Sequence, residues 1–223
     1  MKRPFIFLII FLWFFSGCAW FKHKEEKTAV ELASEGMLLY KGGKYGRAID
    51  SFEKIRDWYP FSKYAILAEL KIADANYHLK EYDQAIFAYE GFENLHPRNE
   101  AIPYVIYQMG MSNFEQIDTT DRDQTFSQKA LNVFNRLIQQ FPNDKYAKKA
   151  REKIKKCLGS LAGHEFYVGR FYLRGKHYQA ALNRFKTVIQ NYPDVGLHLE
   201  ALRYITRVEG LMAEAEKQKK TTK

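Results

Sequence analysis

The chain has 223 residues, of which 46% are hydrophobic and 16% aromatic, and this composition excludes a disordered chain because it can bury a sizeable core. Its formal charge of +9 would ordinarily suggest a nucleic-acid partner, since clustered Lys and Arg attract phosphate. The N-terminus indicates export instead, so we expect no nucleic-acid partner.

The first 17 residues have the pattern of a secretory signal peptide. A basic start, Met1-Lys2-Arg3, precedes an apolar run over residues 4–15. The run is shorter than the about 20 residues of a membrane-spanning helix, but it fits the apolar region of a signal peptide. The segment that follows, Phe15-Ser16-Gly17-Cys18, resembles a bacterial lipobox, in which cleavage leaves the cysteine as an acylated N-terminus. We predict a signal peptide over 1–17, lipidation at Cys18 and a lipidated linker over 18–27; an uncleaved N-terminal anchor is the alternative.

Four copies of one spacing occupy most of residues 28–216. In each copy an alanine is followed four positions later by an aromatic residue, and a proline stands eight positions beyond that. The alanines are Ala48, Ala85, Ala130 and Ala181; the aromatic residues are Phe52, Tyr89, Phe134 and Phe185; the prolines are Pro60, Pro97, Pro142 and Pro193. Upstream small residues, Gly36, Ala73, Gly110 and Gly169, hold the corresponding place in a preceding helix.

This spacing is the tetratricopeptide pattern. It predicts an all-α solenoid of about five helix pairs over residues 28–216, in which each alanine is buried against the small residue of its own pair. The third pair carries eight additional residues, so we expect an exposed loop over 116–124. A helix over 197–216 should cap the solenoid, and the Lys-rich tail over 217–223 should be frayed.

The histidines and cysteines give no pattern of an active site. The six histidines are scattered, and no two have the i, i+4 spacing of a helical zinc site. Cys157 lies at helical spacing from neighbouring alanine and leucine residues, and this apolar pattern predicts a buried thiol. We therefore expect no enzyme, no cofactor, and no catalytic or metal site.

Several segments resemble the BamD (ComL-like) lipoproteins of the β-barrel assembly machinery. They are Tyr59-Pro60-Phe61-Ser62, Asp121-Arg122-Asp123, residues 141–147, a spaced pattern over residues 161–172, and residues 180–184. The resemblance implies a lipid-anchored protein on the periplasmic face of the outer membrane. It also implies binding to the periplasmic domains of BamA, to unfolded outer-membrane β-barrel proteins and to further assembly lipoproteins. A different repeat-containing envelope lipoprotein, such as a pilus or secretin pilotin or a division coordinator, is the alternative.

Two sets of residues are candidates for binding. Aromatic residues of the first helices could line a groove for extended peptides. Tyr40, Tyr77 and Phe114 share one register, and Tyr104 and Tyr107 lie one and two turns away on a similar face of the third pair. Completing the packing between repeats is the alternative for any one of them. Asn183-Arg184 matches the resembled family, and with the final helix it could form a surface for BamA: Asn183, Arg184, Arg203 and Arg207. Here the alternative is an ordinary surface arginine.

The segment over residues 145–156 is strongly basic. Most such runs are the solvated face of a helix, and the alternative is a site for an acidic partner or lipid phosphate.

Overall fold

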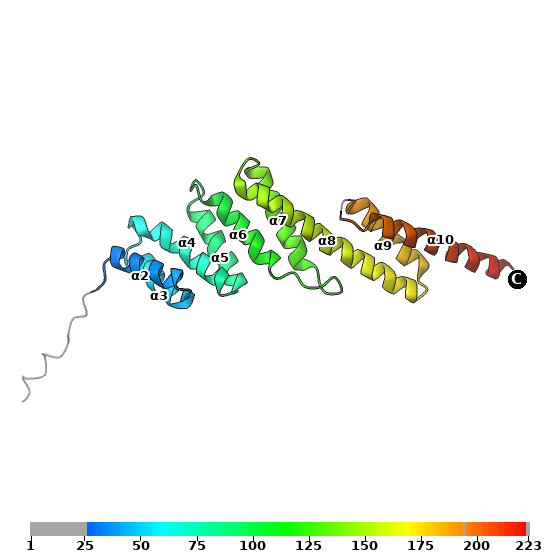
Figure 1. Cartoon of the computed structure of the whole chain (residues 1–223), viewed down its shortest axis with the longest axis horizontal. Coiled ribbons are helices and arrows are strands. Elements are labelled where there is room, and N and C mark those ends of the chain that lie inside the picture. Colours follow the sequence, from blue (N-terminus) through cyan, green and yellow to red (C-terminus); the bar gives the residue numbers. More distant parts are fainter. Residues whose placement is uncertain (1–25, 194, 222–223) are drawn as a thin grey trace, which may run out of the picture.

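The computed structural model describes residues 26–193 and 195–221, and every regular element in these ranges is an α-helix (Figure 1). The signal peptide and Cys18 lie outside the described residues. In chain order the described helices are α2 (Ala29–Lys41), α3 (Tyr45–Trp58), α4 (Lys63–His78), α5 (Tyr82–Leu95), α6 (Ile102–Phe114), α7 (Thr125–Gln140), α8 (Lys145–Arg174), α9 (Tyr178–Asn191) and α10 (His198–Thr221).

Each helix packs against the next one along the chain, so the helices form successive pairs in an elongated solenoid (Figure 1). The pairs are α2 with α3, α4 with α5, α6 with α7, and α8 with α9, and α10 packs on α9 as half of a fifth pair. This arrangement confirms the predicted all-α tetratricopeptide fold. In two cases the first helix of a pair also contacts the first helix of the next pair: α2 contacts α4, and α6 contacts α8.

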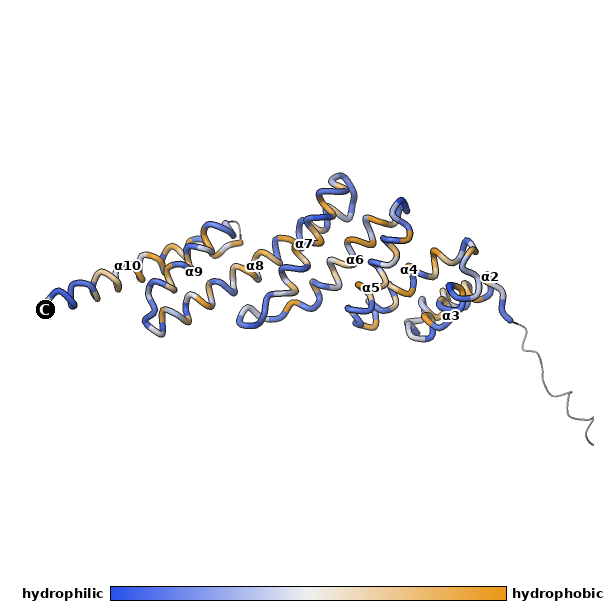
Figure 2. The backbone as a smooth tube through the Cα atoms, turned by 180° about the vertical axis from the view of Figure 1, so that it is seen from behind, coloured by the Kyte–Doolittle hydropathy of each residue, from blue (hydrophilic) through white to orange (hydrophobic). Residues whose placement is uncertain are grey.

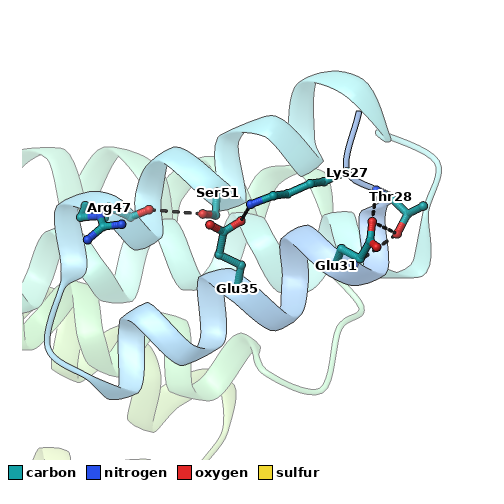
Figure 3. A network of polar contacts seen from close by, with 6 residues as sticks. All are labelled: Lys27, Thr28, Glu31, Glu35, Arg47 and Ser51. Atoms are coloured by element: carbon teal, nitrogen blue, oxygen red, sulfur yellow. Dashed lines mark hydrogen bonds and ion pairs between the residues drawn. The ribbon is translucent and has the colours of Figure 1, made fainter. Parts of the chain in front are cut away.

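The first described helix begins at a capping box (Figure 3). The Thr28 hydroxyl accepts a hydrogen bond from the Glu31 amide, and the Glu31 carboxylate accepts one from the Thr28 amide at 2.8 Å. Two amides that would otherwise lack partners at the helix start are thereby satisfied.

Proline ends the second helix of every pair at the same place. The residue before each proline has φ between −135° and −128°, outside the helical region, and the helix ends one residue earlier. This follows from the clash between the proline ring and the backbone of the residue before it. The four residues concerned are Tyr59, His96, Phe141 and Tyr192.

The four repeat alanines are all fully buried, as expected, but the small residues of the first helices face a different partner. The atoms nearest to the position of a Cβ on Gly36, Gly110 or Gly169 belong to the ring of the repeat aromatic residue of the same pair, not to the alanine. In the three pairs that have a glycine, its nearest neighbour is therefore the aromatic ring and not the alanine that the sequence predicted. The physical reason is size: in these three pairs the glycine, which has no Cβ, leaves room for a fully buried ring close to the helix backbone.

Helix α8 is 30 residues long and serves two parts of the solenoid. Its first half packs against α6 and α7 and completes one core cluster, which extends to Cys157 and Leu161. Its second half packs against α9, and a second cluster begins at Ala162. Tyr192, which follows α9, packs against both clusters.

The loop between α6 and α7 is largely exposed, as expected, but its inner side rests on the middle of α8. Ser160 Oγ donates to Gln124 Oε1 at 2.7 Å, and His164 Nδ1 donates to the Thr120 carbonyl at 2.8 Å. A Cβ on Gly163 would stand 2.7 Å from the Thr120 methyl group. The loop therefore braces α8 at the junction of the two core clusters.

The expectation for the C-terminal tail was wrong for residues 217–221. Helix α10 continues to Thr221, and its last turns are hydrophilic (Figure 2). Lys, Gln and Glu all have good helix propensity, so a helix can continue through them without burial. Residues 222–223 lie outside the described part.

Candidate binding surfaces

The five aromatic residues predicted to line a groove are all half-buried. Tyr40 comes from α2, Tyr77 from α4, and the other three from α6. Each packs with one side against a core cluster and leaves part of its ring at the surface. Both interpretations weighed for these residues therefore apply at once, because the same rings complete the packing and contribute to a surface.

A buried carboxylate connects residues of this surface through hydrogen bonds. Asp74 on α4 is only 1% exposed, and its Oδ1 accepts hydrogen bonds from Tyr89 at 2.8 Å and from Tyr104 at 2.7 Å. The ammonium group of Lys71 donates to Asp74 Oδ2 at 2.7 Å. Burial, followed by the nearby Asp74 charge, raises the pKa of both tyrosines, so each remains a protonated donor. The sequence pattern gave no sign of this cluster.

Asp74 and its hydrogen-bond partners are connected to α2 through the ammonium group of Lys71. The Lys71 ammonium lies 5.0 Å from the centre of the Tyr40 ring. The Tyr40 ring meets Tyr45 and His78 edge to face, at centroid distances of 5.3 and 5.6 Å. Contacts of side chains thus run from α2 through α4 to α6.

A further ring, from the basic start of α8, joins the same surface. The Tyr146 ring lies 5.4 Å from the rings of both Tyr104 and Tyr107. Because this contact crosses from α6 to α8, it could not be read from the register of any one helix. We use the name aromatic surface for the five predicted residues together with Tyr146.

Three lysines at i, i+4 spacing lie against these rings. The ammonium groups of Lys145 and Lys149 stand 5.0 and 5.4 Å from the Tyr146 ring, and that of Lys153 stands 4.4 Å from the Phe114 ring. Cation–π contacts of this kind favour lysine beside an aromatic face. The basic segment and the aromatic residues, treated as separate features in the sequence, therefore belong to one surface.

Tyr77 lies within electrostatic range of both Tyr107 and Glu115. Burial raises the pKa of Tyr77 to about 12, and the charge of Glu115 adds to that effect. Burial raises the pKa of Tyr107 as well, and the charges of Glu152 and of the same Glu115 carboxylate add to that effect. Glu115 therefore lies near both tyrosines, and the surface carries an acidic group as well as its lysines.

The residues predicted to bind a partner near the C-terminus are not all free. Arg184 on α9 donates through one Nη to both carboxylate oxygens of Glu165 on α8, at 3.0 and 2.9 Å. This hydrogen bond raises the pKa of Arg184. The guanidinium, predicted to reach outward to a partner, is therefore already paired with an acid on the neighbouring helix, while 42% of the side chain stays exposed. Asn183, Arg203 and Arg207 are exposed.

Cys157 is fully buried, as predicted, and burial raises the pKa of its thiol to about 11. Such a thiol is protonated near neutral pH and is a poor nucleophile. Within residues 26–193 and 195–221, no group of three or more His, Cys, Asp or Glu side chains is placed to hold a metal ion. In the same ranges, no helix combines the length and the apolar character needed to cross a bilayer.

Comparison with known proteins gives one consistent result. A family described as "YfiO: Outer membrane lipoprotein" matches residues 25–223. An outer membrane protein assembly factor BamD from Rickettsia prowazekii is 34% identical over 206 residues, which are 90% of this chain and 82% of the relative. A protein of the same name from Neisseria gonorrhoeae is 32% identical over 80% of this chain and 70% of the relative. Among solved structures, a thermophilic TPR protein from Thermus thermophilus is similar at 16% identity, with a TM-score of 0.43, over 80% of this chain and 100% of that chain.

Proposed function

The chain belongs to the YfiO family of outer membrane lipoproteins, and from this premise we propose that it is an outer membrane protein assembly factor, a non-catalytic scaffold within the β-barrel assembly machinery. The observation that carries this proposal is its similarity, over most of both chains, to proteins named outer membrane protein assembly factor BamD. The relatives compared carry this one name, so nothing among them favours a pilotin or a division coordinator.

The direct test is purification of the chain from membranes. If the proposal is right, the protein extracted in mild detergent should bring BamA with it. Recovery of the folded, membrane-bound chain without BamA, or with a secretin or a division protein in its place, would instead support the alternative class of repeat lipoprotein.

We propose that the aromatic surface binds unfolded segments of outer-membrane β-barrel proteins. Such segments alternate apolar and polar residues and are rich in aromatic residues near their ends. Half-exposed rings offer contact area at little entropic cost, because a tyrosine has few rotamers to fix. The lysines over Tyr146 and Phe114 add attraction for acidic groups in the same segment.

Crosslinking should distinguish this surface from the rest of the solenoid. A photo-crosslinking amino acid at position 107 or 114 is expected to capture unfolded outer-membrane proteins during their assembly. The matched control is position 87, where Phe87 is 78% exposed and belongs to α5, the second helix of its pair. Equal capture at position 87, or capture only there, would contradict the proposal.

We propose that Asn183, Arg203 and Arg207 contribute to a surface for a periplasmic domain of BamA, with Arg184 at its edge. The three are exposed on α9 and α10, which pack on each other. Since Arg184 already pairs with Glu165, its effect on a partner could be direct or could come from the position of α9.

A charge swap separates these two roles of Arg184. Arg184→Glu places two carboxylates together, so we expect a loss of about 1 kcal/mol in the free energy of unfolding and weaker co-purification with BamA. The double variant Arg184→Glu, Glu165→Arg should restore the unfolding free energy. If it also restores BamA, the pair acts by positioning α9; if BamA stays lost, Arg184 contacts BamA directly. Full BamA recovery with the single variant would remove Arg184 from the interface.

We propose that Cys18 is the lipid anchor and that the chain lies on the periplasmic face of the outer membrane. Acyl chains contribute about 0.8 kcal/mol for each methylene buried in the bilayer, so the anchor should hold the protein there. Cys18→Ala should give a chain that is uncleaved or that appears in the soluble periplasmic fraction. The check is the mass of the N-terminal peptide together with membrane fractionation. An unchanged mass and unchanged fractionation would show that another segment holds the protein.

A further inference from the structure

The end of the solenoid that receives the N-terminal segment exposes apolar side chains. Helix α3 ends at this point and α4 begins here, and Tyr59 Oη between them donates to the Lys27 carbonyl at 3.0 Å, just before α2. Three apolar residues at this end are exposed: Val30 by 53%, Trp58 by 52% and Phe61 by 102%. We name these three residues the tether tip.

Lysines accompany the tether tip. The Lys54 ammonium lies 6.0 Å from the centre of the Trp58 ring, and Lys63 follows Phe61 by two residues. Neither lysine has an ion-pair partner among the described residues, whereas the nearby Arg56 is held by Glu53 and Asp57. Tryptophan, other apolar side chains and lysine together are typical of protein surfaces at the level of lipid headgroups.

The chain itself limits how far this tip can lie from residue 18. Lys27 is fixed through its carbonyl by Tyr59 and through its ammonium by Glu35, at 2.6 Å (Figure 3). Lys27 follows Cys18 by nine positions along the chain, and a segment of that length spans at most about 30 Å when fully extended. A membrane anchor at Cys18 therefore confines the tether tip to the immediate neighbourhood of the bilayer.

The shape of the tip favours lipid over a peptide as its partner. A peptide site encloses its ligand between walls, so its aromatic residues are partly covered, as in the aromatic surface. Phe61 stands on a turn and is fully exposed, so it presents a protruding ring and no wall. A protruding ring is suited to entering a fluid layer of acyl chains.

We propose that the tether tip enters the membrane interface and forms a second membrane contact beside the lipid anchor. This inference rests on the proposed anchoring of residue 18 at the membrane. With two points of contact instead of one, the long axis of the solenoid takes a defined orientation to the bilayer.

Tryptophan fluorescence can test the proposal. The chain has three tryptophans, Trp13, Trp20 and Trp58, and removal of the signal peptide together with Trp20→Phe leaves only Trp58. The chain from Cys18 onward is coupled through this thiol to a maleimide lipid, and the buried Cys157 does not compete. The vesicles contain phosphatidylethanolamine and phosphatidylglycerol, with or without phosphatidylcholine brominated in its acyl chains as a quencher.

We expect bromine to reduce Trp58 emission to roughly half, because a ring at headgroup level lies within reach of the upper acyl chains. Phe61→Ser should abolish most of the quenching. The matched control is Phe171→Ser on α8, where the ring is 58% exposed but far along the chain from the tether, and here quenching should persist.

Equal emission in plain and brominated vesicles, from chains that float with the vesicles and keep their helical content, would overturn the proposal. So would a shift of Trp58 emission caused only by unfolded outer-membrane protein segments in vesicle-free solution, which would make the tip a peptide site. Because the coupling is chemical, the result does not depend on whether cells acylate Cys18 or on BamA binding, which the earlier experiments measure separately.

Discussion

Replacing Asp74 by leucine is expected to lower the free energy of unfolding by about 3 kcal/mol. The substitution leaves two tyrosine hydroxyls without their acceptor in a buried region and removes the carboxylate that pairs with Lys71. The Lys71 side chain keeps some access to water, so the loss should fall at the lower end of the range for broken buried pairs. Urea denaturation followed by circular dichroism gives the measurement.

Two variants test whether the network itself is responsible. Asp74→Asn keeps one carbonyl acceptor and should cost less than Asp74→Leu. Asp83→Leu changes an exposed carboxylate on α5 in the same way and should leave the unfolding free energy within about 0.5 kcal/mol of the natural chain. If Asp74→Leu proves as mild as Asp83→Leu, the carboxylate does not hold the three donors as described.

The Asp74 variants also connect stability to binding. Tyr104 and Lys71 lose their common partner in Asp74→Leu, so the rings of Tyr104 and Tyr40 should lose their fixed positions. Crosslinking of unfolded substrate at position 107, which shares the Tyr146 ring with Tyr104, should then fall at a temperature where the variant remains folded. Unchanged crosslinking would show that the aromatic surface does not need this network.

Gly110→Ala and Gly91→Ala should have opposite effects on stability. A Cβ on Gly110 would overlap the fully buried Phe134 ring, so we expect a loss of about 1–3 kcal/mol from over-packing. A Cβ on Gly91, inside α5, meets no atom within 4 Å, and alanine has the higher helix propensity. Gly91→Ala should therefore raise the free energy of unfolding by about 0.5–1 kcal/mol.

Thermal and urea denaturation of the two variants, side by side, provide the check. Gly159→Ala on α8 is a second variant with open space around the new methyl group, and it should behave like Gly91→Ala. If Gly110→Ala is stabilising, the Phe134 ring has room to move. That result would contradict the close packing of this ring against the backbone of α6.

The sequence alone predicts most of the architecture because each repeat signal acts locally. A proline acts on the residue before it, and an alanine and an aromatic residue four apart share one helical face, so helix ends and buried positions follow from spacing. The choice of ring partner for Gly110 does not follow in this way. It depends on how the two helices of a pair cross, and spacing within one helix says nothing about that.

The candidate surfaces were predicted only in part, for a related reason. The aromatic residues of α2, α4 and α6 share a register and could be found from it, whereas Tyr146 approaches them from another helix. Asp74 bonds residues 15 and 30 positions away, and Arg184 pairs with an acid 19 positions away. No periodicity of the sequence marks such contacts, since charged residues at these separations are common and only the folded arrangement selects among them.

The double role of α8 determines how much of the chain must be present before the central core cluster can close. The core cluster of the second and third pairs includes Ala147, Ala150, Cys157 and Leu161 from that helix. A chain that ends after α7 therefore exposes the apolar faces that these residues would cover, and an unfinished hydrophobic face is open to aggregation. A truncation within residues 141–160 should thus be more harmful to the protein than one after residue 162, where this cluster is already closed.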